Sequence, residues 1–248
     1  MSMEGVYKLR SFIFFFLTGL LTLGFMVVSL FLFSKKINAK LAKFWAKILL
    51  MLLKDICKIN LKITGKKNIP KTPFIVVCKH QSAMETLVFP LLLPKPIFII
   101  KKAILFIPFL GLCLKRAGAI LIDRSKGRGA IRYIQTQLSS LSNENSLVIF
   151  PEGTRTKAGI RIEKYNAGIA MIYETLRWPV LPVALNTGMF WSKHGPMRSG
   201  TATMKFLPGI LPSKEYNRKQ FLKQLNEIIE NESIKLYKTT LAAELLQN

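Results

Sequence analysis

Residues 74–86 read Phe74-Ile75-Val76-Val77-Cys78-Lys79-His80-Gln81-Ser82-Ala83-Met84-Glu85-Thr86. The apolar run 74–78 predicts a strand buried on both faces, and the polar residues begin where that strand would hand over to a helix. Open α/β sheets usually place their chemistry at such strand ends. His80 is one of only two histidines, so few side chains can act as a general base near neutral pH. The segment therefore predicts a strand end that carries chemistry.

Further short apolar runs predict the rest of a sheet. These runs are 97–100, 119–122, 147–150, 180–185 and 201–206. Apolar residues at helical spacing fall between or after them, in 129–141, 167–176 and the long polar segment 213–246. Alternating strands and helices predict an α/β fold with a mostly parallel central sheet flanked by helices. No repeat or linker is visible after residue 58, so we expect one globular domain over residues 59–248.

Residues 1–58 predict a membrane anchor. From Ser11 to Phe33 the chain carries no charge and is rich in Phe, Leu, Val and Ile. A run of about 23 residues makes a helix of about 34 Å, enough to cross the hydrocarbon core. It is too long for the core of a signal peptide, and no small-residue cleavage site follows it. Lys35 and Lys36 come next, which predicts that the rest of the chain lies on the cytoplasmic side, at the inner membrane in a bacterium.

A second helix is expected over residues 38–58. Its apolar residues at helical spacing are Leu41, Phe44, Trp45, Ile48, Leu49, Leu52, Leu53 and Ile56, and the lysines on the other side are Lys40, Lys43, Lys47, Lys54 and Lys58. This pattern is typical of an amphipathic helix in the membrane interface, where each lysine adds about 1 kcal/mol of attraction to an anionic surface. The alternative is a core-facing helix with a solvated basic face. We favour the interfacial helix because it adjoins the anchor.

The charge of the chain limits its partners. Lys and Arg number 37 against 13 Asp and Glu, giving a net charge of +24 over 248 residues. Such a charge indicates an anionic partner: anionic lipid, an acidic protein or nucleic acid. We expect no nucleic acid, because lysine far exceeds arginine and no basic-aromatic platform motif occurs. Cys57, Cys78 and Cys113 lack CxxC spacing, which argues against disulfides and predicts no metal site.

His80 and Glu85 have the residue types of an acid–base pair. A histidine at the loop entering a helix can remove a hydroxyl proton as the oxygen attacks a thioester. Glu85 in the first helical turn would then hold the imidazole tautomer and stabilise the imidazolium. A second interpretation is equally open: Ser82 and Glu85 have the spacing of a capping box, with Ser82 as N-cap and Glu85 three residues later.

A second polar segment follows the apolar run 147–150 and reads Pro151-Glu152-Gly153-Thr154-Arg155. Gly153 permits close backbone approach, and Arg155 can hold a phosphate through two parallel hydrogen bonds. Alone this segment is weak evidence, since loops often contain such residues. Because it follows His80 by about 70 residues, the two segments together are more specific evidence of function than either one alone.

Together the two segments resemble the first and third sequence blocks of the glycerolipid acyltransferases. Lys101 to Gly111 is similar to the second block, although Ala103 stands where members often have an acidic residue. Val180 to Val183 is similar to the fourth block, and the likeness runs from about residue 58 to 210. The family commonly has His-x4-Asp where this chain has His-x4-Glu. The extra methylene of Glu85 changes reach but not charge.

The resemblance implies a function. It implies transfer of a fatty acyl group from acyl-CoA or acyl carrier protein to the sn-2 hydroxyl of lysophosphatidate, giving phosphatidate for phospholipid synthesis, with no bound cofactor. It also implies an N-terminal helical pair in one leaflet. The substrate-binding residues that it implies are Lys101, Lys102, Arg124, Glu152, Gly153, Thr154 and Arg155. Two alternatives stay open: another lysolipid acceptor, or a non-catalytic, membrane-anchored protein that binds anionic lipid.

Overall fold

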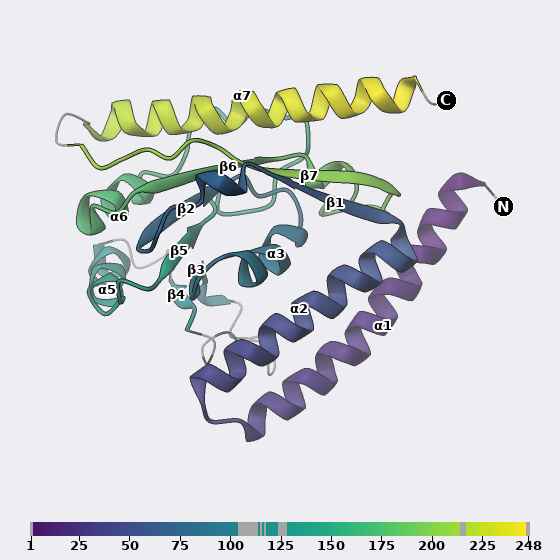
Figure 1. The fold of residues 1–248 in the computed structure, drawn as a ribbon, viewed down its shortest axis with the longest axis horizontal. Helices are drawn as coiled ribbons and strands as arrows, with labels where there is room; N and C mark the ends of the chain where they lie inside the picture. Colours follow the sequence, from purple (N-terminus) through teal and green to yellow (C-terminus); the bar gives the residue numbers. More distant parts are fainter. Residues whose placement is uncertain are drawn as a thin grey trace.

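We describe a computed structural model of the chain over residues 2–103, 114, 116, 118–123, 128–213 and 217–246. Within these residues seven strands form one sheet, in the order β1-β7-β6-β2-β5-β3-β4 (Figure 1). The strands are β1 (Ile59–Thr64), β2 (Phe74–Cys78), β3 (Pro96–Lys101), β4 (Ile120–Ile122), β5 (Ser146–Ile149), β6 (Val180–Leu185) and β7 (Gly200–Phe206). Every neighbouring pair is parallel except β6 and β7. The predicted mostly parallel sheet is confirmed.

Strand β2 shows why this sheet has a core on each side. Successive side chains in a strand point to opposite faces. Phe74, Val76 and Cys78 accordingly pack into one hydrophobic cluster, while Ile75 and Val77 pack into the other. All five residues of β2 are buried, which is the burial that an uninterrupted apolar run predicts for a central parallel strand.

The helices form a layer on each face of the sheet. Helices α2 (Lys35–Cys57) and α3 (Met84–Leu92) contribute to one cluster, together with Phe14 of α1 (Met3–Phe31). On the opposite face, α5 (Arg128–Ser139), α6 (Gly168–Leu176) and α7 (Arg218–Leu245) contribute to the other. Figure 1 shows α7 and the α1–α2 pair on opposite sides of the sheet. Two short turns of 3₁₀ helix, η1 (Lys66–Asn68) and η4 (Thr187–Met189), lie in loops.

The α1–α2 pair corresponds to the predicted anchor. Among the described residues, α1 is the one helix long and apolar enough to cross a membrane. It begins at Met3, earlier than the apolar run that starts at Ser11, because the Ser2 hydroxyl accepts the Gly5 amide and caps the first turn. The two helices are joined by side-chain hydrogen bonds. The Ser29 hydroxyl donates to Asn38 Oδ1 at 2.6 Å, and Trp45 Nε1 donates to the Thr22 hydroxyl at 3.0 Å.

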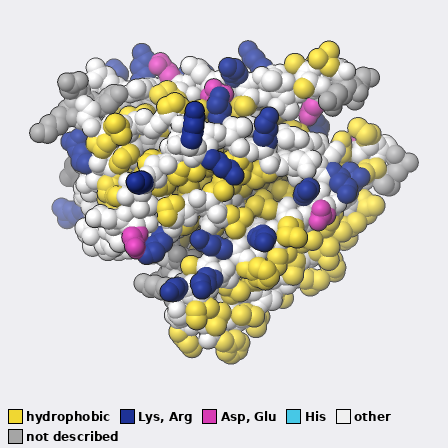
Figure 2. Space-filling model, in the orientation of Figure 1, with side chains coloured by type: hydrophobic (Ala, Val, Ile, Leu, Met, Phe, Trp, Pro, Cys, Tyr) yellow, Lys and Arg dark blue, Asp and Glu magenta, His cyan; other side chains and the backbone are white. Residues whose placement is uncertain are grey.

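The outer side of α1 exposes large apolar side chains, which include Phe12, Phe15, Phe16, Leu20, Leu23, Val27, Val28 and Phe31. Figure 2 shows hydrophobic side chains gathered over the α1–α2 pair. Soluble monomers rarely expose an apolar surface of this extent.

Helix α2 combines features of both interpretations of its sequence. Ala46, Leu49, Leu53 and Cys57 are buried in the core, as the core-facing alternative requires. Its described lysine side chains, Lys36, Lys40, Lys43, Lys47 and Lys54, are exposed, as the interfacial helix requires.

Candidate active site

The two predicted functional segments meet at one edge of the sheet. Strands β2 and β5 are parallel neighbours, so their carboxyl ends bring His80 and Glu152 together. The His80 amide donates to Glu152 Oε1 at 3.2 Å. The carbonyl oxygen of His80 accepts from the amide and the hydroxyl of Thr156, at 2.8 and 3.1 Å. Hydrogen bonds therefore fix the backbone of the histidine against the loop that carries Arg155.

The imidazole of His80 is largely enclosed and makes no hydrogen bond with the described residues. It stacks on the Phe150 ring, and its Nδ1 atom is buried with no hydrogen bond from the described residues. Burial, and secondarily the Arg155 guanidinium, lower the pKa of His80 to about 4. The imidazole is consequently neutral at pH 7 and able to accept a proton.

Arg155 supplies a cation beside that neutral base. In the described part of the chain its guanidinium makes no hydrogen bond and no ion pair. The loop before it turns sharply: Gly153 has φ of +67°, the left-handed region that favours glycine. The Gly153 amide donates to the Phe150 carbonyl at 3.1 Å, while the Thr154 side chain lies at the surface. An unpaired guanidinium on such a turn is suited to an anionic ligand.

The Glu152 carboxyl completes the polar surroundings of His80. Its Oε2 atom is buried and has no hydrogen-bond partner among the described residues. Burial raises the pKa of Glu152 to about 8, although the Lys79 charge and the His80 amide act in the opposite direction. Burial therefore favours the protonated form of Glu152, and a protonated carboxyl can donate a hydrogen bond to an anionic oxygen.

Glu85 is fully buried and binds the start of α3. Its Oε1 accepts from the amides of Gln81 and Ser82, both at 2.9 Å, and from the Thr187 hydroxyl at 2.8 Å. The Ser82 hydroxyl in turn accepts the Met84 amide at 3.1 Å. Among the described residues no hydrogen bond joins Glu85 to the His80 imidazole. Helix α3 begins at Met84 with Ala83 as its N-cap and no side-chain capping bond, so the expected capping box with Ser82 as N-cap is wrong. Glu85 instead binds the backbone amides of the two residues before that cap, and its catalytic role stays a prediction. Burial raises the pKa of Glu85 to about 7, against the lowering effect of these hydrogen bonds.

The remaining predicted residues are less informative. Lys101 ends β3 and Lys102 follows it. Both side chains are exposed and make no hydrogen bond within the described residues, so their role stays a prediction. Arg124 and residues 104–111 of the second block lie outside the described residues. Among the described residues, no group of three or more His, Cys, Asp or Glu side chains lies close enough to hold a metal ion.

Several residues near the site were not predicted from the sequence. Phe150 stacks on His80, Thr187 binds Glu85, and the Gln81 side chain accepts the Gly188 amide at 3.1 Å. Nothing in the sequence pairs Thr187 with Glu85, which lies 102 positions earlier. Lys79, which is buried, could have been noticed in the sequence. It directly continues a buried apolar run, and a lysine that is buried needs a partner for its charge.

Comparison with known proteins gives consistent matches. The acyltransferase family model matches residues 60–186. The chain is 32% identical over 152 residues to the 1-acyl-sn-glycerol-3-phosphate acyltransferase of Pseudomonas aeruginosa, a match that covers 61% of this chain and 59% of that protein. This is less than two thirds of the relative's length. It is 30% identical over 187 residues to the enzyme of the same name from Borreliella burgdorferi, covering 73% of each chain.

A solved structure has the same fold. The crystal structure of the 1-acyl-sn-glycerophosphate acyltransferase from Thermotoga maritima superimposes with a TM-score of 0.75 at 22% identity. The match covers 94% of this chain and 98% of that one. The similarity therefore extends over the N-terminal helices as well as the sheet.

Proposed function

This chain belongs to the acyltransferase family, and on that premise we propose that it transfers a fatty acyl group to the sn-2 hydroxyl of lysophosphatidate, giving phosphatidate. One observation carries the proposal: within the described residues, the neutral His80 imidazole makes no hydrogen bond and lies near the Arg155 guanidinium, which makes no hydrogen bond or ion pair. A base next to a cation is what a hydroxyl acceptor with a nearby phosphate requires. The names of the relatives support lysophosphatidate as that acceptor.

His80 is the general base of the proposed reaction. The imidazole takes the proton of the sn-2 hydroxyl as its oxygen attacks the thioester carbonyl carbon. The new ester C–O bond forms, the C–S bond breaks, and the proton passes from the imidazolium to the leaving thiolate. Glu85 assists through its negative charge, which stabilises the imidazolium, and through the Gln81 and Ser82 amides that shape the loop after His80.

Arg155 and Glu152 hold the acceptor in this proposal. The guanidinium binds the phosphate through charge-assisted hydrogen bonds. A protonated Glu152 donates to a substrate oxygen, which would give a role to its Oε2 atom, buried without a hydrogen bond among the described residues. Gly153 and Thr154 shape the loop, and Lys101, Lys102 and Arg124 attract the anionic substrates.

The acyl donor in this proposal is acyl-CoA or acyl carrier protein. Both carry the acyl group as a thioester, which is already activated, so the reaction needs neither a metal ion nor a bound organic cofactor. A net charge of +24 favours the approach of either anionic donor.

Membrane attachment is the second part of the proposal. The apolar outer side of α1 enters the bilayer, and the exposed lysines of α2 contact anionic lipid headgroups. The lysines that follow the apolar run support a catalytic domain on the cytoplasmic side. This arrangement would bring a membrane-dissolved acceptor to the domain without extracting it into water.

The test is an acyl-transfer assay with purified protein in detergent. Lysophosphatidate, lysophosphatidylethanolamine and lysophosphatidylglycerol are each offered with acyl-CoA and with acyl carrier protein as donor. We expect phosphatidate from lysophosphatidate and little turnover of the other acceptors, with His80→Ala as the inactive control. Preference for another lysolipid would reassign the acceptor. Vesicle binding without turnover of any acceptor would establish the non-catalytic alternative.

A further inference from the structure

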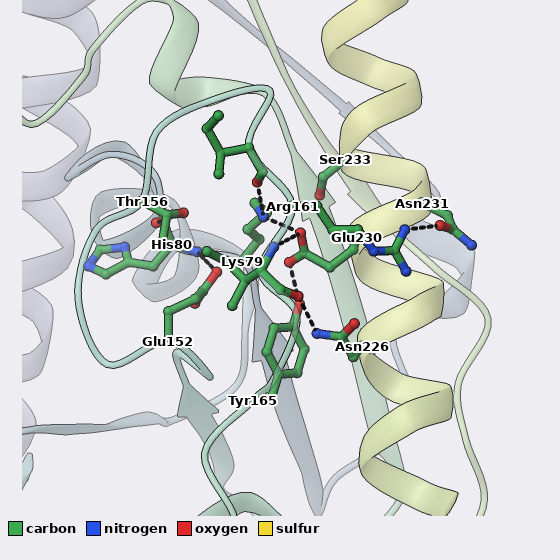
Figure 3. Close-up of polar contacts among 12 residues, drawn as sticks. Lys79, His80, Glu152, Thr156, Arg161, Tyr165, Asn226, Glu230, Asn231 and Ser233 are labelled. Atoms are coloured by element: carbon green, nitrogen blue, oxygen red, sulfur yellow. Dashed lines mark hydrogen bonds and ion pairs between the residues drawn. The ribbon is translucent and has the colours of Figure 1, made fainter.

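Lys79, the residue directly before His80, points its ammonium group into the protein interior. The side chain is fully buried. Its Nζ atom donates to Glu230 Oε2 at 2.5 Å and to the Ile160 carbonyl at 3.1 Å (Figure 3). Lysine is almost never fully buried unless it is paired, so the position of this lysine depends on Glu230.

Glu230 comes from α7 and is also fully buried. Besides Lys79, it accepts the Ile162 amide at 2.9 Å and the Tyr165 hydroxyl at 2.8 Å. One turn earlier in α7, Asn226 donates to the Ile162 carbonyl at 2.8 Å. Figure 3 shows Lys79 and Tyr165 reaching this carboxylate from two other parts of the chain. Helix α7 thereby holds the segment 160–165, which continues the loop that carries Arg155.

The same network reaches His80 from the other side. Thr156, the residue after Arg155, donates twice to the His80 carbonyl, and the Lys79 amide donates to the Val183 carbonyl at 3.1 Å. The two loops of the site are thus bonded to each other at Thr156 and are both bonded to Glu230. The carboxylate of Glu230 is the point at which α7 meets both.

Net stability is a weak explanation for a buried pair of this kind. A buried ion pair contributes little net stability, because desolvation offsets most of the attraction, and apolar replacements are often neutral or stabilising. What a hydrogen-bonded buried pair adds is a defined geometry. Geometry matters greatly in catalysis, since a mutation far from the reacting groups that misplaces them by about 1 Å can cost about 10²-fold in rate.

We propose that Lys79 and Glu230 are positioning residues that hold the His80 loop and the Arg155 loop in register. The role rests on the proposed acyl transfer for its kinetic readout, because neither side chain touches the substrate. It adds α7, a helix outside all four sequence blocks, to the parts of the chain that determine turnover.

The decisive variant is Lys79→Met/Glu230→Gln. It removes both buried charges together, so no unpaired charge remains in the core, and the replacements are close to the originals in length. We expect a thermal unfolding midpoint near that of the parent and a kcat lower by about 10- to 10²-fold. If the pair served stability alone, a double variant as stable as the parent would also have the parent's kcat. A stable double variant with the parent's kcat overturns the proposal.

A matched control is available on the same helix. Glu232, two residues after Glu230, pairs with Lys205 at 2.7 Å and is partly exposed. Glu232→Gln should leave kcat unchanged, and a loss equal to that of the double variant would overturn the assignment. If the double variant does not fold, Glu230→Asp replaces it. That change keeps the charge but shortens the reach, so we expect a lower kcat, and unchanged turnover counts against the proposal.

Hydrogen–deuterium exchange gives a readout that does not depend on activity. Peptides covering residues 156–165 should exchange faster in the double variant than in the parent, and at the parent's rate in Glu232→Gln. Unchanged exchange in the double variant overturns the positioning role. If the parent acylates no lysolipid at all, the proposed function fails, while the exchange data still decide whether this pair holds the two loops.

Discussion

The imidazole of His80 and the ring of Phe150 lie nearly face to face, with ring centroids 4.0 Å apart and planes inclined by 20°. Phe150 directly precedes the loop that carries Glu152 and Arg155, so the second polar segment supplies an apolar wall for the histidine of the first. The Phe150 ring therefore contributes to the burial that lowers the pKa of His80 and keeps the imidazole neutral.

The first prediction concerns His80 itself. His80→Ala should lower kcat by about 10²- to 10⁴-fold, while circular dichroism and thermal unfolding stay close to those of the parent. The other histidine is a matched control, because His194 is exposed on a loop; His194→Ala should keep the parent's rate. A well-folded His80→Ala protein with near-normal turnover would exclude His80 as the base.

The second prediction is a shift of the pH profile in Phe150→Ala. A neutral base is lost as the pH falls through its pKa, so the parent's kcat/KM should have an acid limb near pH 4 due to His80. Loss of the ring admits water and raises the pKa of His80 toward its usual value of about 6.5. The acid limb should therefore move to higher pH. The substrate phosphate, with a second pKa of about 6, titrates alike with both proteins, so an unshifted acid limb would contradict this role for Phe150.

The third prediction separates the acceptor from the donor. Arg155→Ala removes the unpaired guanidinium and should raise the KM for lysophosphatidate by roughly 10- to 100-fold, the equivalent of a hydrogen bond to a charged group. The KM for the donor should change little, and Arg155→Lys should fall between. Arg218, which pairs with Glu174 at the surface, is the control. An unchanged acceptor KM in Arg155→Ala would leave Arg155 a structural role only.

The fourth prediction distinguishes the two interpretations of Glu85. Oε1 accepts three of its hydrogen bonds, and the carbonyl oxygen of glutamine can accept the same three. Glu85→Gln should therefore fold with near-normal stability. Without the negative charge it should lose about 10²-fold or more in rate, by analogy with charge removal in a catalytic triad. Glu85→Asp keeps the charge and should retain more activity. If the glutamine variant is instead the faster of the two, Glu85 only holds the backbone before α3 through its hydrogen bonds.

The fifth prediction concerns membrane attachment. The parent should stay on anionic vesicles in about 1 M salt, because salt screens the lysines but not the apolar contact of α1. Replacing the exposed Phe12, Phe16 and Leu20 by serine should give a protein that binds at low salt and is released at high salt. Leu211→Ser changes an equally exposed residue of the domain and should have no effect. Retention of the triple variant at high salt would show that α1 is not the anchor.

Much of the sheet could be predicted because its central strands are buried on both faces. Phe74 to Cys78 and Val180 to Leu185 are uninterrupted apolar runs, and both are strands over those residues. Strand β1 was missed because Asn60 and Lys62 alternate with apolar residues at the edge of the sheet. An alternating pattern over only six residues is a weaker signal for a strand than an uninterrupted apolar run. It also follows directly on the amphipathic α2, which makes the start of the strand hard to recognise.

The site was predictable to the extent that it is local in sequence. His80 and Glu152 each follow a buried strand, and adjacent strands bring them together. The partners of Glu85 and Lys79 were not predictable in this way, because Thr187 and Glu230 come from distant elements. In α7, Glu230 directly follows the buried Ile229, yet helical spacing alone does not say which loop such a glutamate meets.

The ion pair between Lys79 and Glu230 also has a consequence for biosynthesis. A chain emerges from the ribosome with its N-terminus first, so α1 and the His80 loop emerge long before α7. These two residues are 151 positions apart, and at 5 to 20 residues per second roughly 8 to 30 seconds separate them. Throughout that interval Lys79 lacks the glutamate that allows its burial in the finished protein. A nascent chain therefore displays its hydrophobic helix first and completes the surroundings of its histidine last, so a transcript cut short before α7 would yield a protein that lacks a finished site.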